Sequence, residues 1–506
     1  MVKAAYSLHE DWRYMFNARD TSLIGVCAVH RAGRLEKGMD EEAARYTSSL
    51  EFDREILEAV IYINMAHVRL LERVGVLSEQ EAREAVALLG KLLESPPMLD
   101  RHEFEDIHMV VEDWLSRRSP RVGSMLALGK SRNDAVVAAI KLRLKQRVAQ
   151  LHESIDELCA TLLKQAEREA ETIFPVYTHL QRAAPATFGF ILHGYATRLL
   201  KLYPHLRLVY ELCDESPLGS AAVAGTSVPL DREYAAQLLG FGKISDNALE
   251  ATASRDFIIE SISLTLLVAL ILSSLAEELV LYSSEEFSLL ELPDELSATS
   301  SIMPQKKNPV VAEITRTKVW EVLGLLSTAL GIAARQPSGY SLDLQQITPK
   351  LWKALDETVS ALRLTTKMIE NLSINTARSA EACKPPTGIV EVANHLTLNY
   401  GVPFRKAHNL AGRLSRLISE GKLTPETFQQ TLQEAGVSVG ITLEDALQLM
   451  EPRRVIHGYK TRGSANPQYV KTAVKQAFQE LERQREWFLE RRRKMENALA
   501  TLREAE

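Results

Sequence analysis

Glycine and proline are scarce in this sequence, which contains 24 glycines and 19 prolines among 506 residues. Four long stretches contain neither residue, namely 130–174, 243–292, 351–384 and 468–506. Because glycine and proline interrupt helices and favour turns, their scarcity argues against a disordered, collagen-like or turn-rich all-β protein. The four stretches are predicted to be largely helical.

Cysteine is also rare, and Cys27, Cys159, Cys213 and Cys383 stand far apart. None forms a Cys-x-x-Cys pair, so the sequence predicts neither a zinc site nor a disulfide framework, and we expect no metal. Reduced thiols fit a cytoplasmic protein, and the first residues lack the apolar run of a signal peptide. We therefore expect a cytoplasmic location.

The chain has no strong excess of charge and no apolar run long enough for a membrane span. Its net charge is −6 and its pI is about 6.1, so no field attracts nucleic acid or an anionic membrane. The longest apolar run, residues 262–276, has 15 residues, whereas a span needs about 20. We expect a buried core helix there, and neither nucleic acid nor membrane as a partner.

Apolar residues after position 130 recur at spacings of three and four, which is typical of one face of a helix. They are Leu144, Val148, Leu151, Ile155, Leu158 and Leu162. If 134–174 is one helix, it is about 60 Å long and needs neighbours to cover it. Residues 258–281 are apolar nearly all round, which predicts burial on all sides. We predict an all-α protein with a central bundle of very long helices, completed by oligomerisation.

Two breaks divide the chain into three predicted parts. Residues 119–129 interrupt the helical pattern before the longest stretch, and the Lys-Pro-Pro-Thr-Gly segment at 384–388 follows the central helices. The predicted parts are an N-terminal helical domain with an extension at 1–30, a central long-helix bundle and a C-terminal helical domain, over 1–129, 130–384 and 385–506.

Three polar stretches carry residue types suited to catalysis or anion binding. Residues 299–309 form a loop with hydroxyl, lysine and amide groups, 177–182 include a histidine, and 129–134 precede the longest helix. Capping and solvated charge are sufficient to explain each stretch taken alone. The functional interpretation is a mobile loop that stabilises an oxyanion, an oriented imidazole, and a helix start that binds an anion.

Together these stretches resemble the argininosuccinate lyase branch of the fumarase/aspartase superfamily, which includes the delta-crystallins. The resemblance runs from about residue 33 to 470. It rests on SSIMPQKKNP (300–309), YTHLQRAAP (177–185), GKSRND (129–134), EDIH (105–108), PLGSAAVAGT (217–226), SRDF (254–257) and GVPFRKAH (401–408).

The resemblance implies a carbon–nitrogen lyase that eliminates an amine from an N-substituted aspartate and releases fumarate. The expected substrate is argininosuccinate, cleaved to arginine and fumarate as in arginine biosynthesis. By resemblance, Ser300 is the catalytic base that removes a proton, and Lys306 stabilises the resulting dianion. His179 assists departure of the amine, with Glu313 as its partner.

The family also implies substrate contacts and an assembly. The substrate-binding residues would be Ser131, Arg132, Asn133, Thr178, Gln181, Asn308, Tyr340 and Gln345. No cofactor is implied. The superfamily forms homotetramers in which three subunits build each active site, so we expect a homotetramer with shared sites.

Several positions depart from the family pattern. Thr299 replaces a usual glycine, and Ala127 and Leu128 replace a usual His-Thr pair. Leu342 and Thr348 stand where lysines are usual, so recognition of the amine is open. The alternatives are a lyase for another N-succinyl amine and a non-catalytic, crystallin-like structural protein. A nucleotide substrate, as in adenylosuccinate lyase, is disfavoured by the Gln-Lys-Lys-Asn loop.

Overall fold

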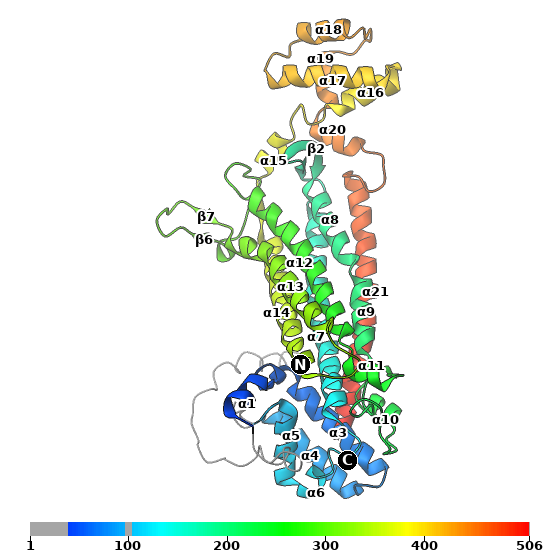
Figure 1. Ribbon diagram of the computed structural model, residues 1–506. Helices are drawn as coiled ribbons and strands as arrows, with labels where there is room; N and C mark the ends of the chain where they lie inside the picture. The colour runs from blue at the N-terminus through cyan, green and yellow to red at the C-terminus, as the bar shows by residue number, and fades with distance from the viewer. Residues whose placement is uncertain (1–38, 97–103, 505–506) are drawn as a thin grey trace.

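The computed structural model describes residues 39–96 and 104–504, so the predicted extension at 1–30 lies outside the described residues. The described chain is elongated and mainly helical, with long helices running side by side (Figure 1). The prediction of an all-α fold with a bundle of very long helices is confirmed.

Short and medium helices form one end of the molecule. They are α1 (Glu41–Thr47), α2 (Leu50–Asp53), the 3-10 turn Arg54–Ile56, α3 (Leu57–Arg73), α4 (Glu79–Glu94), α5 (Ile107–Arg118) and α6 (Pro120–Gly123). Helix α3 is buried along almost its whole length and packs on α4 and on the start of the central bundle. This end of the molecule is therefore anchored to the bundle.

The central bundle contains the longest helices. It is built from α7 (Arg132–Arg168), α8 (Phe188–Leu200), α9 (Tyr203–Cys213), α12 (Asp256–Tyr282), α13 (Val310–Ala333) and α14 (Thr348–Asn371), with the shorter α10 (Arg232–Leu238), α11 (Ala248–Ala253) and α15 (Thr376–Ala382) beside them. Helix α7 is about 55 Å long, and its predicted apolar face is fully buried against its neighbours.

The expectation of one helix over 134–174 is wrong at its end. Helix α7 stops at Arg168, and Phe174 lies in a strand. Phe174 is fully buried between the rings of Phe188 and Tyr282, and its strand pairs with the next segment of the chain. Tertiary packing and strand pairing thus end the helix where neither glycine nor proline marks a break.

The strands form small two-stranded pairs that connect the helices. Strands β1 (Ile173–Thr178) and β2 (Gln181–Thr187) form an antiparallel hairpin. The remaining pairs are β3 (Glu215–Ser216) with β4 (Lys243–Ile244), β5 (Leu290–Glu291) with β8 (Ser373–Ile374), and β6 (Ala298–Thr299) with β7 (Lys307–Asn308). Two further 3-10 turns span Asp294–Leu296 and Leu342–Gln346.

The last part of the chain separates into two regions. Helices α16 (Val390–Tyr400), α17 (Phe404–Ser419), α18 (Pro425–Glu434) and α19 (Leu443–Leu449) enclose their own small core at the far end of the molecule (Figure 1). The chain then passes through α20 (Pro452–Gly458), and α21 (Pro467–Glu504) runs back along α7 as part of the main core. The division at 129 and 384 stays a prediction.

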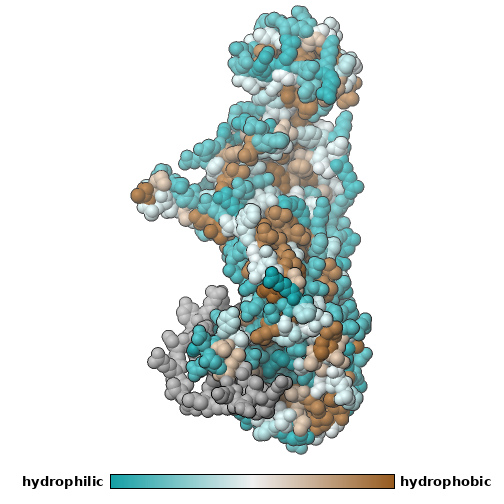
Figure 2. All heavy atoms as spheres, viewed as in Figure 1, coloured by the Kyte–Doolittle hydropathy of each residue, from teal (hydrophilic) through white to brown (hydrophobic). Residues whose placement is uncertain are grey.

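The apolar run at 262–276 lies within α12, and the sequence expectation that it is too short for a membrane span is wrong for the helix as a whole. By length and composition alone, α12 is long and apolar enough to cross a membrane, and its most apolar 18-residue window has a mean hydropathy of 2.2. Of the most apolar 18-residue segment of α12, 56% is buried inside the chain, where α12 packs against α13 and α14. Apolar side chains on these three helices remain exposed: Leu267, Leu270, Ile314, Trp320, Leu323, Leu330 and Leu364. Figure 2 shows apolar surface on the middle of the bundle.

Candidate active site

Ten of the twelve predicted site residues lie in three separate regions of the chain, and the other two, Tyr340 and Gln345, line a cavity together with Arg132 beside the first of these regions. The first region is the start of α7 near the N-terminal helices, the second is the β1–β2 hairpin, and the third is the β6–β7 loop with the start of α13 (Figure 1). Among the described residues, no hydrogen bond or ion pair joins one region to another. In particular, none joins His179 to its predicted partner Glu313. The role of each residue stays a prediction.

The turn before α7 is held in one conformation by its backbone and caps. Gly129 has a positive φ of 73°, and a β-carbon there would lie 2.9 Å from Leu230. Ser131 is the N-cap of α7, and its backbone N–H donates to Asp134 over 2.9 Å. The positive φ favours glycine, and any β-carbon would also require the Leu230 side chain to move, so the turn presents Ser131 to Asp134 in a fixed arrangement.

The segment 217–226 is fixed against this helix start. Asp134 is fully buried and accepts hydrogen bonds from the backbone N–H groups of Gly219 and Ala221, over 3.1 and 2.9 Å. The Asn133 side-chain amide donates to the Ala222 carbonyl over 2.8 Å. Burial raises the pKa of Asp134 to about 6. The PLGSAAVAGT motif (217–226) therefore lies beside the start of α7 and is held there mainly by the buried carboxyl group of Asp134.

Arg132 points away from this motif into a neighbouring cavity. Its guanidinium pairs with Asp106 at 2.5 Å and with Glu112 at 3.5 Å. Lys130, which is almost entirely buried, donates to Asn64 over 2.5 Å and lies 3.7 Å from Glu112. Glu112 therefore links the two basic residues of the GKSRND motif.

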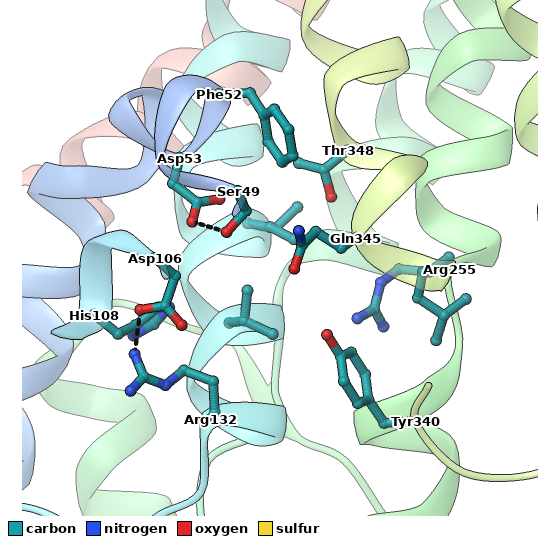
Figure 3. A pocket seen from close by; sticks show the side chains of 13 residues that line it. Ser49, Phe52, Asp53, Asp106, His108, Arg132, Arg255, Tyr340, Gln345 and Thr348 are labelled. Atoms are coloured by element: carbon teal, nitrogen blue, oxygen red, sulfur yellow. Dashed lines mark hydrogen bonds and ion pairs between the residues drawn. The ribbon is translucent and has the colours of Figure 1, made fainter. Parts of the chain in front are cut away.

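The cavity brings residues from five parts of the chain together (Figure 3). The predicted residues Arg132, Tyr340 and Gln345 line it, as does Thr348, one of the positions that depart from the family pattern. Sequence reasoning did not assign the other polar residues of its wall, which are Ser49, Asp53, Asp106, His108 and Arg255. Asp106, His108 and Arg255 belong to quoted motifs, whereas nothing in the sequence singled out Ser49 or Asp53.

The two sides of the cavity differ in charge. Figure 3 shows Asp53 and Asp106 on one side, and Arg255 and Tyr340 on the other. Burial raises the pKa of Asp53 to about 7, although its Oδ2 accepts a hydrogen bond from Ser49 over 2.5 Å. Burial also holds the pKa of His108 well below its usual range, so this imidazole is neutral. The cavity can therefore hold a cation on one side and an anion on the other.

The departures at 342 and 348 differ in position. Thr348 is 4% exposed and lines the cavity, whereas Leu342 is 42% exposed and does not. Lys353 pairs with Glu321 at 2.9 Å, and neither Lys350 nor Lys353 lines the cavity. A shifted lysine from this helix therefore does not replace the missing one.

The tip of the β1–β2 hairpin is strained. Thr178 pairs with Gln181, so His179 and Leu180 form a two-residue turn with φ values of 54° and 56°. Such turns normally use Asn-Gly, because other residues avoid positive φ. All four side chains are exposed. Strained backbone of this kind is typical of functional sites, and here it projects the His179 imidazole outward from the chain.

We expect Leu180→Gly to raise the free energy of unfolding by about 1 kcal/mol, because a left-handed conformation costs a residue with a β-carbon about 1–2 kcal/mol. Leu180 is 65% exposed, so little packing is lost. Leu208→Gly is the control, because Leu208 lies in α9 and glycine destabilises a helix by a similar amount. The measurement is thermal unfolding, and an equal loss in both variants would show that the turn stores no strain.

The β6–β7 loop surrounds the Ser300 hydroxyl with donors. Its Oγ accepts from the backbone N–H groups of Ile302 and Met303, over 3.4 and 3.1 Å. Hydrogen bonds to the charged form of a group favour that form, so they assist Ser300 in a role as a base. Thr299 lies in β6 opposite Lys307 and has no positive φ, so the replacement of glycine strains nothing in this conformation.

The two lysines of the loop have different surroundings. Lys307 pairs with Glu291 at 3.0 Å and Asp294 at 2.6 Å, which fixes the base of the loop. Lys306 is exposed and has no side-chain partner among the described residues. Asn308 ends β7, and Glu313 lies in the first turn of α13. Lys306 is thus the lysine available to a ligand.

No group of three or more histidine, cysteine, aspartate or glutamate side chains able to hold a metal ion occurs in the part of the chain that the structure describes. What the site offers is one hydroxyl with two backbone donors, an unpaired lysine, an exposed imidazole, a helix start, and a cavity with opposed charges. These groups suit proton abstraction and the stabilisation of negative charge.

Comparison with known proteins matches residues 33–324 to the model of a lyase family. Argininosuccinate lyase from Methanothermobacter thermautotrophicus is 38% identical over 464 residues, covering 90% of this chain and 99% of that protein. Argininosuccinate lyase from Aquifex aeolicus is 37% identical over 431 residues, covering 84% of this chain and 93% of that protein.

Solved structures agree with the sequence comparison. An EDDS lyase variant with bound fumarate has a TM-score of 0.81 and 25% identity, covering 92% of this chain and 94% of that chain. A class II fumarase from Schistosoma mansoni shares the fold, with a TM-score of 0.68 and 18% identity, covering 83% of this chain and 95% of that chain. The chain therefore belongs to the lyase family of the fumarase/aspartase superfamily, whose enzymes eliminate a group from succinate-derived substrates.

Proposed function

We propose that this protein is an argininosuccinate lyase, which cleaves argininosuccinate to arginine and fumarate. The observation that carries the proposal is the identity of 38% to an argininosuccinate lyase across almost the full length of both chains. The predicted catalytic residues are all present, and the charged cavity beside the α7 start adds a place for the amine half. A non-catalytic structural protein would have no need of the strained His179 turn or an unpaired Lys306.

At the fumarate half, Ser300 takes a proton from the carbon next to a carboxylate. The carbanion spreads its charge into that carboxylate, and Lys306 and Asn308 stabilise the dianion. The α7 start, with Ser131 and Asn133, holds the substrate's carboxylates through its free donors. The C–N bond then breaks, and His179 gives the leaving nitrogen a proton. Glu313 orients the imidazole in this scheme.

At the amine half, the buried carboxyl of Asp53 and the Asp106 carboxylate suit a cationic group such as a guanidinium. Arg132 forms an ion pair with Asp106, whereas no ion pair joins Asp53 to a basic side chain among the described residues, so Asp53 is the carboxyl group available to a ligand cation. The burial of Asp53 supports this role, because a cation stabilises an ionised carboxylate more strongly where water is excluded.

A second candidate is a lyase for a different N-succinyl amine. It is favoured by Thr348, which leaves the cavity without the usual lysine, and by the similarity to an EDDS lyase. Both candidates share the fumarate half and differ only in the amine.

The three regions of the site require more than one chain in this proposal. The α7 start, the hairpin and the β6–β7 loop lie apart within one chain (Figure 1), and α12, α13 and α14 expose a set of large apolar side chains. We propose a cytoplasmic homotetramer in which these helices pack together and each site takes one region from each of three subunits.

Trp320→Glu is expected to break the tetramer and abolish activity together. Trp320 lies on α13 and is 70% exposed in the chain, and a buried, unpaired carboxylate in the interface is strongly destabilising. Leu398→Glu is the control, because Leu398 is 82% exposed on α16, away from the bundle. Analytical ultracentrifugation at micromolar concentration measures the assembly. A stable, active monomer would contradict both the tetramer and the shared site.

Arginine should bind more tightly as the pH rises from 6 to 8. With a pKa of about 7, the Asp53 carboxyl is about 10% ionised at pH 6 and about 90% at pH 8, so affinity for a cation gains up to about tenfold. Inhibition of fumarate release by added arginine is the measurement. In Asp53→Asn the inhibition should be weak and independent of pH. If the affinity of Asp53→Asn for arginine rose equally between pH 6 and 8, a group other than Asp53 would be responsible for the pH dependence.

The proposed function is tested with purified protein by the appearance of fumarate absorbance from a panel of N-substituted aspartates. Argininosuccinate should give the highest kcat/KM. A higher value for another N-succinyl amine would support the second candidate, and no fumarate from any member would support a structural protein.

A further inference from the structure

Arg255 is a buried cation without a counter-ion among the described residues. It is 3% exposed and stands at the N-terminal end of α12. Its Nη1 donates to the backbone carbonyls of Thr252 and Ser254, over 3.2 and 2.9 Å. Its buried Nε has no hydrogen-bond partner, and no carboxylate pairs with it in the part of the chain that the structure describes. A buried guanidinium in this condition is costly unless an anion binds to it.

The guanidinium points into the cavity described above. Figure 3 shows it directed toward the Tyr340 hydroxyl and Gln345, across the cavity from Asp53 and Asp106. The Tyr340 hydroxyl is a second donor on this side. The unoccupied space is about 30 Å³, which holds about two water molecules or a group of the size of a carboxylate.

Thr348 lines the same cavity. The position that commonly carries a lysine in this family is therefore a neutral hydroxyl in this chain, and the neighbouring lysines do not reach the cavity. Arg255 is consequently the cation on this side of the cavity among the described residues, because Arg132 is engaged by Asp106 and Glu112.

We propose that Arg255 binds the carboxylate of the released amine, so that the enzyme selects amines that are amino acids. This rests on the proposed function for the location of the amine half, but it does not depend on which amino acid is released. The space of about 30 Å³ takes the carboxylate alone, and the acidic side chains on the opposite wall, Asp53 and Asp106, suit a cationic group at the other end of a molecule that extends beyond this space.

The test uses the reverse reaction, in which an amine adds to fumarate, the new C–N bond forms, and a proton is added to the adjacent carbon. Amines are supplied in pairs that differ only by a carboxylate: arginine and agmatine, lysine and 1,5-diaminopentane, alanine and ethylamine. Loss of fumarate absorbance gives kcat/KM for each. In the wild type, the member with the carboxylate should be favoured at least tenfold in every pair that reacts.

Arg255→Met should remove this preference by lowering kcat/KM for the amino acid about tenfold or more, with little change for its partner. Arg255→Gln is a second variant that keeps an amide donor for the two backbone carbonyls and should behave alike. Adding Thr348→Lys to either variant should restore part of the preference. A purely structural role for Arg255 would lower both members of a pair equally, and rescue by Thr348→Lys would then be absent.

Two outcomes overturn the proposal: a wild type that does not prefer the member with the carboxylate, or variants that keep the preference. Failure of the proposed function is a different result. If lysine or alanine reacts better than arginine, argininosuccinate is not the substrate, and the preference within the reacting pair still decides the role of Arg255.

Discussion

Replacing Ser300 with alanine is expected to reduce fumarate release by a factor of a thousand or more while the fold and the assembly remain intact. The hydroxyl is exposed on the β6–β7 loop, and its hydrogen bonds join it to the backbone of the same loop, so its loss affects little packing. General base catalysis contributes about 10²–10⁴-fold.

Ser301→Ala is the matched control, because Ser301 is the next residue, is exposed, and is not one of the two residues whose backbone N–H groups donate to the Ser300 hydroxyl. Its rate should stay close to that of the wild type. Circular dichroism and ultracentrifugation establish that both variants fold and assemble alike. A Ser300→Ala protein with more than a tenth of the wild-type rate would remove Ser300 from the role of base.

Lys306→Met should lower kcat by about a hundredfold or more, with a small effect on KM. The dianion exists only after proton removal, so a cation that stabilises it acts on the transition state more than on the bound substrate. Removal of one such group typically costs about 3–4 kcal/mol. The kcat and KM values with argininosuccinate give the measurement.

Lys307→Met is the control for Lys306→Met, because it removes the charge of the adjacent lysine in the same way. Lys307 pairs with Glu291 and Asp294, which are both largely exposed, and exposed ion pairs contribute about 0–1 kcal/mol each. We expect a modest loss of activity through a looser loop. Equal losses in the two variants would mean that the loop needs positive charge in general and that Lys306 has no special role.

The helical architecture could be predicted because long-range packing and local pattern agree along most of the chain. The buried face of α7 follows the spacing seen in the sequence, from Leu144 to Leu162. The end of α7 could not be predicted, because the strand that follows it is determined by the packing of Phe174 against residues far along the chain. The local sequence around residue 168 does not indicate these long-range contacts.

The candidate site divides in the same way. Residues within short motifs, such as Ser300 and Lys306, could be proposed from the sequence, because a motif keeps its members close together along the chain. Ser49 and Asp53 could not, because an ordinary helical segment places them in the cavity and only the fold brings them opposite Arg255. The position of Thr348 in the wall, and of Leu342 outside it, also required the structure.

The strained hairpin tip has a consequence for the history of proteins of this kind. A turn that holds His179 and Leu180 at positive φ is under constant pressure to drift toward Asn-Gly, since that change relieves strain and leaves the strand pairing unaltered. If His179 protonates the leaving nitrogen as we propose, selection for the imidazole opposes this change. We therefore expect a relative that keeps the bundle but carries Asn-Gly at this turn to lack lyase activity, so these two residues should separate active enzymes from structural proteins of the same fold.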